Sequence, residues 1–381
     1  MSVPSIAIIL SGLGAGGAER VIAQLARHWC NKSYDVSIIS FDHVSDPVYH
    51  TMPEAVRIYR LGGKTGRGIR GNLAKVHSLR RVFRQIQPDI AISFLTKINL
   101  IAALAAWGTV PGLICSERNN PEQQQAHPLW NQLLRFAYHR ADRIVCQTRA
   151  VRRCFAPSLQ DRIVVIPNPI AGFEDIQIPD SGHTIAAAGR LTWQKGFDQL
   201  ITAFAKISDT YPDWNLDIWG DGPDRSALQN QIMRSGLSDR VTLRGNSPCP
   251  GSWLEETNLF VLSSRYEGFG NVLAEAMLAG LPVIAMKCDF GPEEMVTSEE
   301  SGLLVPPGDI DQLAAGMARM MGDEELRNRL GEKARIAATA FAPETIFRQW
   351  DRVVASVTEE TRPGLPESKT ANVSGKIMDQ A

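Results

Sequence analysis

The sequence predicts an α/β protein built from two doubly wound, Rossmann-like domains that face each other across a cleft. The chain has 381 residues, which exceeds the usual size of a single hydrophobic core. Strand-like apolar runs alternate with helical periods, as expected for parallel sheets covered by helices. The alternation breaks down once, near residues 168–183, and then restarts. Each half is therefore expected to form its own sheet.

The first half, residues 1–170, contains six predicted strands and four predicted helices. The strands are expected at 6–10, 36–40, 90–93, 112–116, 143–146 and 163–166. The helices are expected at 18–29, 72–86, 98–107 and 129–139. Short connections between strands and helices of this kind predict a parallel sheet with helices on both faces.

The second half, residues 171–342, repeats this pattern, with strands expected at 184–188, 216–219, 241–243, 259–262 and 283–286. A helix at 343–357 is expected to cross back to the first domain. Residues 358–381 are polar and rich in Pro, Ser, Lys and Glu, so a disordered tail is predicted.

Composition argues against several classes of protein. The formal net charge is −1, so the chain is not a dedicated nucleic-acid binder. The six cysteines form no close pair of the metal-binding or redox type, and neither Asp-x-Asp nor HExxH occurs, so no metal is expected. No basic leader precedes the first apolar run, and no apolar stretch approaches the roughly 20 residues of a membrane span. A cytoplasmic protein is predicted.

A glycine-rich loop follows the first predicted strand. Gly16 and Gly17 open a helix whose backbone amides could bind an anion. Gly12, Gly14 and Gly17 also satisfy G-x-G-x-x-G, and Asp42 lies near the position of a ribose-binding acid. An NAD-dependent oxidoreductase is therefore an alternative, although a tight turn that needs glycine is equally consistent with this loop.

The second half carries a more complete anion site. Arg190 directly follows a strand and Lys195 directly precedes a helix, which suits a diphosphate. Two cations five residues apart are usually solvated, but their place at the carboxyl edge of the sheet favours binding. Asn246 follows another strand at the same edge, where backbone groups could contact a base.

Two glutamates eight residues apart, Glu267 and Glu275, flank a predicted helix start. The free amides after Gly270, on Asn271 and Val272, favour a phosphate. Glu275 is then placed to accept hydrogen bonds from a ribose, and Glu267 from a transferred sugar. Most helix glutamates are merely solvated, but the apolar surroundings here would make an unpaired carboxylate costly.

The segments GGAER, GRLTWQKG, GDGP and E-x7-E, in this order, resemble the family 4 retaining glycosyltransferases of the GT-B fold. The resemblance covers nearly the whole chain up to about residue 357. It implies a nucleoside-diphosphate-sugar donor on the C-terminal domain, an acceptor on the N-terminal domain, retention of anomeric configuration and no cofactor. It also implies that Arg190 and Lys195 bind the diphosphate, that Glu267 contacts the donor sugar, and that Glu275 contacts the ribose.

Further segments bear on the two substrates. Glu117, Arg118 and Asn119 follow a strand at the cleft, and Arg118 stands where relatives often have a sugar-contacting histidine. The segment CDFGPEE resembles a segment of relatives that use UDP-galactose or UDP-N-acetylgalactosamine, with Glu294 at the matching acid. We therefore expect transfer of a hexose or N-acetylhexosamine from a UDP-sugar to a lipid-linked or polysaccharide acceptor in surface-glycan synthesis. A GDP-sugar donor is the alternative.

Residues 64–84 contain seven basic residues and no acid, interleaved with apolar residues. A basic amphipathic helix of this sort suits an anionic membrane or a polyisoprenyl diphosphate head group. The protein is thus expected at the inner face of the cytoplasmic membrane; a solvated helix face and a non-catalytic membrane-binding protein are the alternatives. Nucleic-acid binding is a less favoured explanation of this basic segment, because no aromatic platform for base stacking accompanies its cations. The residues expected to face the membrane are Arg70, Lys75, Arg80, Arg81 and Arg84.

Overall fold

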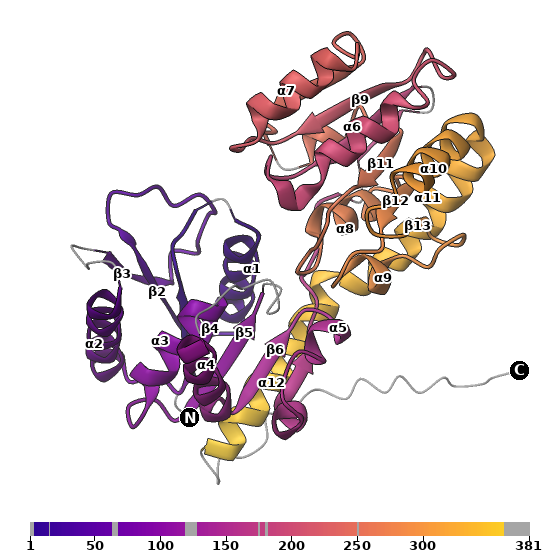
Figure 1. The fold of residues 1–381 in the computed structure, drawn as a ribbon. Coiled ribbons are helices and arrows are strands. Elements are labelled where there is room, and N and C mark those ends of the chain that lie inside the picture. Colours follow the sequence, from indigo (N-terminus) through magenta and orange to yellow (C-terminus); the bar gives the residue numbers. More distant parts are fainter. Residues whose placement is uncertain are drawn as a thin grey trace, which may run out of the picture.

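The structure is a computed structural model that describes residues 4–14, 16–62, 68–118, 128–173, 176–179, 182–249 and 251–361. In this part of the chain, two parallel sheets each carry helices on both faces and form separate bodies (Figure 1). The prediction of two doubly wound α/β domains is confirmed.

The N-terminal sheet has the spatial order β3-β2-β1-β4-β5-β6-β7, and all of its strand pairs are parallel. The strands are β1 (Ser5–Leu10), β2 (Asp35–His43), β3 (Arg57–Gly62), β4 (Ile90–Phe94), β5 (Gly112–Glu117), β6 (Arg143–Cys146) and β7 (Ile163–Val165). The helices are α1 (Gly17–Asn31), α2 (Ile69–Ile86), α3 (Thr96–Ala106), α4 (Pro128–Arg140) and α5 (Arg149–Arg152).

Alternation along β1 explains why both faces of this sheet are covered. Ile6, Ile8 and Leu10 pack into a cluster with α1, whereas Ala7 and Ile9 pack on the other face with α2, α3 and α4. The chain reverses its direction of sheet growth between β1 and β4. Ligands of open α/β sheets bind at such a reversal, outside the carboxyl ends of the strands.

The C-terminal sheet repeats the design in the order β10-β9-β8-β11-β12-β13. Its strands are β8 (Thr184–Ala188), β9 (Asn215–Trp219), β10 (Val241–Gly245), β11 (Leu259–Leu262), β12 (Val283–Met286) and β13 (Leu303–Val305). Its helices are α6 (Phe197–Ala205), α7 (Arg225–Arg234), α8 (Asn271–Leu278), α9 (Pro292–Met295), α10 (Ile310–Gly322) and α11 (Glu324–Ala338). The reversal falls between β8 and β11.

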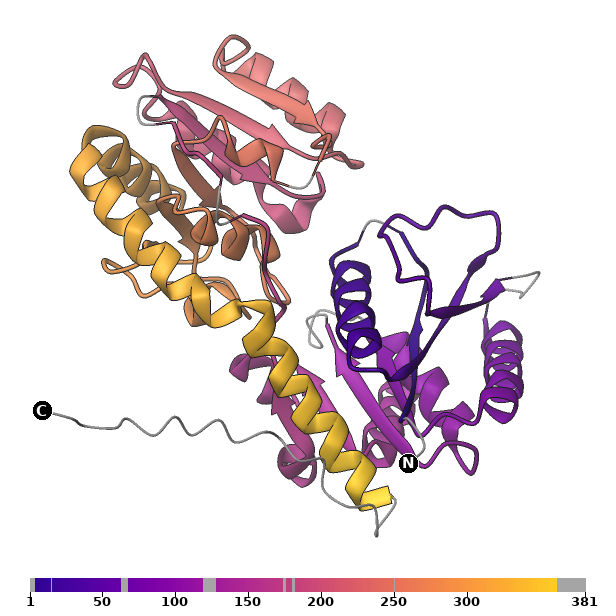
Figure 2. The same cartoon turned by 180° about the vertical axis from the view of Figure 1, so that it is seen from behind.

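The last helix, α12 (Pro343–Thr361), runs back along the N-terminal domain (Figure 2). Trp350 is fully buried there, edge-to-face with Trp29 at 6.3 Å and stacked on Phe94 at 5.9 Å between ring centroids. The helix starts beside the first crossing of the chain, where Ile170 N donates to the Phe341 carbonyl at 2.9 Å. The two crossings therefore lie side by side and connect the domains together.

Three features differ from the sequence predictions. The edge strand β3, RIYRLG, was not predicted because its arginines interrupt the apolar pattern. The strand β13 was not predicted either, because its 3 residues are too few to show a pattern. The tail predicted from residue 358 starts too early, because α12 continues to Thr361. Residues 362–381 lie outside the described residues.

Within the described ranges, no helix combines the length and the apolar character needed to cross a bilayer.

Candidate functional site

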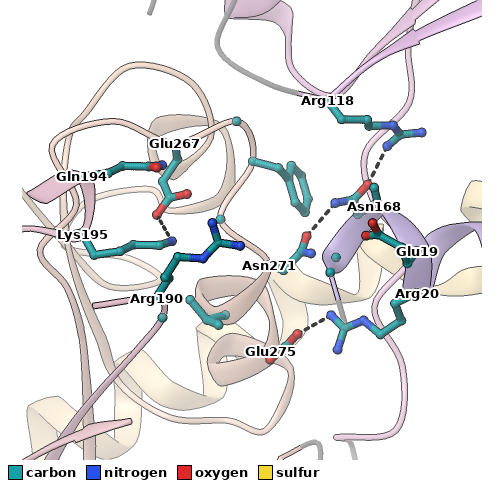
Figure 3. Close-up of a pocket in the computed structure, with 18 of the residues that line it drawn as sticks. Glu19, Arg20, Arg118, Asn168, Arg190, Gln194, Lys195, Glu267, Asn271 and Glu275 are labelled. Atoms are coloured by element: carbon teal, nitrogen blue, oxygen red, sulfur yellow. Dashed lines mark hydrogen bonds and ion pairs between the residues drawn. The ribbon is translucent and has the colours of Figure 1, made fainter. Parts of the chain in front are cut away.

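A cavity of about 920 Å³ lies between the two domains. Its walls come from loops that follow strands of both sheets, including those after β1, β4 and β5 on one side and after β8, β10 and β11 on the other, as expected at the carboxyl ends of open α/β sheets. Figure 3 shows side chains from both domains reaching into it. The predicted site residues that line it are Gly16, Gly17, Arg118, Arg190, Lys195, Glu267, Gly270, Asn271, Val272 and Glu275.

Lys195 and Glu267 form the ion pair at one end of the cavity. Lys195 Nζ lies 2.7 Å from Glu267 Oε1, and Ser264 Oγ donates to the same oxygen at 2.6 Å. Glu267 is 5% exposed, so it would be costly to leave this carboxylate unpaired. The two donors fix its orientation at the edge of the cavity.

A glycine turn brings Lys195 to this position. Gly196 has φ 64°, and a Cβ there would lie 2.1 Å from the Ser263 carbonyl oxygen. Only glycine therefore allows the loop after β8 to pack this closely against the end of β11. Ser263 Oγ also donates to the Lys195 carbonyl at 2.9 Å, which fixes the lysine backbone beside the Glu267 loop.

The N-termini of α8 and α1 both border the cavity and pack closely against each other. Asn271 is the first residue of α8, and a Cβ on Gly17, the first residue of α1, would lie 2.6 Å from Asn271 Nδ2. Helix N-termini carry free amides and a partial positive charge, so the part of the cavity next to these two helix starts suits a phosphate group. Arg190 and Lys195 add two side-chain cations from the C-terminal domain (Figure 3).

Glu275 lies one turn into α8 and is 5% exposed. Its Oε1 forms an ion pair with Arg20, which belongs to the first turns of α1 (Figure 3). The predicted ribose acid is thus held by a cation of the opposite domain.

Arg118 borders the cavity, but its guanidinium turns away from Glu267 (Figure 3). Nε donates to Ser116 Oγ at 2.7 Å and Nη1 donates to Asn168 Oδ1 at 2.5 Å. The guanidinium also packs on the rings of Phe94 and Trp350, at 5.1 and 5.6 Å from their centroids. Burial lowers the pKa of Arg118 to about 9. The guanidinium therefore connects β5 to the linker and to α12 instead of pointing toward Glu267.

Asn168, in the linker, joins Arg118 to the start of α8. Its Nδ2 donates to Asn271 Oδ1 at 2.6 Å, while its Oδ1 accepts from Arg118. One amide side chain thus connects β5 of the first domain to the start of α8 in the second.

Three other predicted residues of the described part of the chain lie outside this group. Glu117 is 1% exposed and accepts from Thr96 Oγ1 at 2.8 Å and Tyr138 OH at 2.6 Å, inside the N-terminal domain. Glu294 accepts from the backbone amides of Arg149 and Ala150, both at 2.9 Å, and so ties the two domains together. Asn246 is outside the lining, although Ser247 belongs to it. Asn119 lies outside the described residues.

Asp42, the acid expected to bind a ribose if the protein were an NAD-dependent oxidoreductase, is occupied by contacts within its own domain. Asp42 accepts from Leu13 N at 2.8 Å and from Ser40 Oγ at 2.6 Å, and it pairs with Arg60. Burial opposes ionisation of Asp42, but these hydrogen bonds more than offset it and lower its pKa. Gly12, Gly14 and Asp42 lie outside the lining of the cavity. This carboxylate organises the glycine loop within its own domain.

Among the lining residues that sequence reasoning missed, Arg20 and Asn168 make contacts between the two domains. Arg20 belongs to GGAER and lies three residues after Gly17, so helical spacing could have placed it near the cavity. Asn168 lies in a Pro-Asn-Pro linker with no periodicity, and its contacts depend on how the two domains pack.

Comparisons with known proteins agree with this geometry. The model described as Glycosyltransferase Family 4 matches residues 15–171, and the model described as Glycosyl transferases group 1 matches residues 171–337. The two matches meet in the linker between the sheets.

The chain is 31% identical over 373 residues to an exopolysaccharide phosphotransferase of Streptomyces coelicolor, covering 89% of this chain but only 39% of that protein. It is 26% identical over 363 residues to the GalNAc-α-(1→4)-GalNAc-α-(1→3)-diNAcBac-PP-undecaprenol α-1,4-N-acetyl-D-galactosaminyltransferase of Campylobacter jejuni, covering 92% and 98%. Anabaena HepE, solved with UDP and glucose, superposes with a TM-score of 0.77 at 20% identity over 93% of this chain and 100% of that one. With both domains matched, the chain belongs to the family 4 glycosyltransferases, which have the GT-B fold.

Proposed function

We propose that this glycosyltransferase is retaining and metal-independent. In this proposal it transfers a hexose or N-acetylhexosamine from a UDP-sugar to a lipid-linked or polysaccharide acceptor in bacterial surface-glycan synthesis. The observation that carries the proposal is the arrangement of one cavity. Arg190, Lys195 and the start of α8 converge there between Glu267 at one end and Glu275 at the other.

This arrangement suits the charges of the reaction. When the bond between the anomeric carbon and the diphosphate oxygen breaks, the leaving UDP gains negative charge and the sugar becomes oxocarbenium-like. The acceptor oxygen bonds to the anomeric carbon, and its proton leaves with UDP. Arg190, Lys195 and the α8 amides stabilise the leaving diphosphate, so the proposal needs no metal ion. Glu267 contacts the transferred sugar and Glu275 the ribose.

Relatives support the choice of substrates. HepE was solved with UDP and glucose, and the Campylobacter relative is named as an N-acetylgalactosaminyltransferase acting on a diphospho-undecaprenol-linked glycan. The Streptomyces relative is named for exopolysaccharide. These names favour UDP over GDP and a surface glycan as the product.

A donor screen tests this function. Hydrolysis of UDP- and GDP-sugars should occur with at least one UDP-sugar, and UDP but not NAD should raise the melting temperature. Lys195→Ala should lower turnover by about 100-fold, since the leaving diphosphate loses a preorganised cation. Lys206→Ala is the matched control, because Lys206 pairs with Asp311 on the surface of the same domain. Turnover that survives Lys195→Ala and Arg190→Ala contradicts the assignment.

The α2 helix supports the proposed contact with an anionic membrane at the inner face of the cytoplasmic membrane. Arg70, Arg81 and Arg84 are exposed on one helix face together with Leu73, which is 61% exposed. Lys75 and Arg80 are half-buried; Lys75 lies 5.5 Å from the Phe41 ring centroid, and Arg80 Nη1 donates to the Ala105 carbonyl at 3.4 Å. Among the contacts of the described residues, Lys75 and Arg80 have intramolecular partners that compete with a membrane, so the proposed contact rests on Arg70, Arg81 and Arg84.

Vesicle sedimentation tests this contact. Changing Arg70, Arg81 and Arg84 to Gln should reduce binding to phosphatidylglycerol vesicles by more than tenfold, at about 1 kcal/mol per cation. The same changes at Arg329, Lys333 and Arg335, which are exposed on α11, should have little effect. Equal losses in the two triple variants would contradict a specific role of α2.

A further inference from the structure

Trp193 is a large aromatic side chain at the edge of the cavity. Its side chain is 63% exposed, and it begins the short turn Trp193–Lys195 between β8 and α6. Single exposed apolar residues are common on protein surfaces, so exposure alone means little. Trp193 differs because the structure holds it in place.

Arg265 holds the indole from behind. Its guanidinium carbon lies 4.6 Å from the ring centroid, and Nη1 donates to the Trp193 carbonyl at 2.6 Å. Asp198 fixes the guanidinium in turn, accepting from Nη1 at 2.8 Å and Nη2 at 2.6 Å. Arg265 N also donates to the Gln194 carbonyl at 2.8 Å. One face of the indole is thus covered by the Arg265 guanidinium, which Asp198 holds in place. The solvent-exposed surface of Trp193 is therefore mainly the opposite ring face.

The neighbours of Trp193 place it at the Glu267 end of the cavity. Its ring centroid lies 6.4 Å from that of Tyr266, the residue before Glu267. Gln194 Nε2 donates to the Tyr266 carbonyl at 3.0 Å, and Gln194 and Lys195 lie beside Glu267 in Figure 3. Glu275 marks the nucleoside end of a bound donor and Glu267 the sugar end. What lies beyond the transferred sugar is the acceptor.

We propose that Trp193 is an acceptor-binding platform whose open face stacks on a pyranose ring of the acceptor glycan. The inference rests on the proposed function, because it needs a donor in the orientation given above. Pyranose rings present a face of C–H groups that packs well on an indole. Tryptophan supplies a large contact area and an N–H donor with little loss of side-chain freedom. A ring held before binding adds affinity because less ordering is needed.

Fluorine NMR can observe this contact directly. The chain has 8 tryptophans, which can be labelled as 5-fluorotryptophan, and Trp193→Phe assigns the relevant resonance. The UDP-saturated protein is titrated with octyl glycosides of glucose, galactose, N-acetylglucosamine and N-acetylgalactosamine. At least one should shift the Trp193 resonance while the resonance of Trp107, 58% exposed at the end of α3, stays still. A Trp193 resonance that no glycoside moves overturns the proposal.

Paired variants test the aromatic character of the contact. Trp193→Leu should weaken binding of the active glycoside by about tenfold and Trp193→Tyr by much less, since only tyrosine keeps a ring face. Trp107→Leu should change nothing. If Trp193→Leu and Trp193→Tyr weaken glycoside binding equally, the proposed stacking is wrong. If Trp193→Leu weakens UDP binding by a similar factor, the proposal is also wrong, because the indole would then contact the nucleotide.

The same protein samples distinguish failure of the Trp193 platform from failure of the proposed function. If wild type hydrolyses a UDP-sugar while the Trp193 resonance stays silent, only the platform fails. If wild type neither binds UDP nor hydrolyses any UDP-sugar, the proposed function fails.

Discussion

The ion pair between Arg20 and Glu275 joins the two domains at the cavity. Their side chains are 23% and 7% exposed, and they belong to opposite domains. If Glu275 binds the ribose as proposed, the ribose and the Arg20 guanidinium compete for the same carboxylate. We therefore predict that Arg20 weakens donor binding.

Arg20→Ala should make UDP bind more tightly, by about fivefold, because a partly buried pair of this kind contributes roughly 1 kcal/mol. Isothermal titration calorimetry measures the change. Arg27→Ala is the control, since Arg27 is an exposed arginine of the same helix. If UDP binds more weakly to the Arg20 variant, Arg20 is itself a nucleotide ligand and competition is the wrong description.

At the scale of elements, Asn168 couples the linker to the start of α8. Asn168→Asp keeps an acceptor for Arg118 but removes the amide that donates to Asn271. Loss of one hydrogen bond of about 1 kcal/mol at the diphosphate end should slow UDP-sugar hydrolysis by roughly fivefold to tenfold. The melting temperature should change little, whereas Asn168→Leu, which loses both contacts, should lower stability and turnover together. Unchanged turnover in Asn168→Asp would show that the link has no role in catalysis.

The docking of α12 depends on Asp351. This carboxylate contacts His28 Nε2 at 3.0 Å and Trp29 Nε1 at 3.1 Å on α1, and Lys32 Nζ at 2.7 Å directly after that helix. Burial opposes its ionisation, but the hydrogen bonds from His28 and Lys32, with their charges, more than offset burial and lower the pKa. The folded pKa thus lies below the unfolded one. The stabilisation is present above the unfolded pKa and is lost as pH falls through the folded value.

Asp351→Asn should therefore lower the free energy of unfolding by ~2 kcal/mol at neutral pH. The difference from wild type should shrink below about pH 4, where the unfolded aspartate is protonated. Urea denaturation at both pH values measures this, with the exposed Asp161→Asn as control. A difference that does not depend on pH would mean that lost packing, and not charge, explains the effect.

For the whole molecule, the sequence was sufficient for the central strands of the two sheets, but not for β3 and β13, and for the part of the site that lies on loops of one domain. Buried strands and amphipathic helices have periodic patterns, and strand ends converge by topology, so Arg190, Lys195, Glu267 and Glu275 could be placed together. Contacts between domains could not be predicted. The Arg20–Glu275 pair, the Arg118–Asn168–Asn271 chain and the Glu294 contact with α5 all depend on how the domains pack. The sequence shows Trp193 as part of the GRLTWQKG segment, but it does not predict that this residue is exposed or that Arg265 packs against its ring.

We propose above that this cavity holds a UDP-sugar whose anomeric configuration is retained in the product. Time-resolved proton NMR of the first turnovers, with a UDP-α-sugar hydrolysed by the wild-type protein, measures this configuration. The α-anomer of the free sugar should form first, and Lys195→Ala should slow its appearance. A β-anomer that forms first, or an unchanged rate in Lys195→Ala, would refute retention at this site.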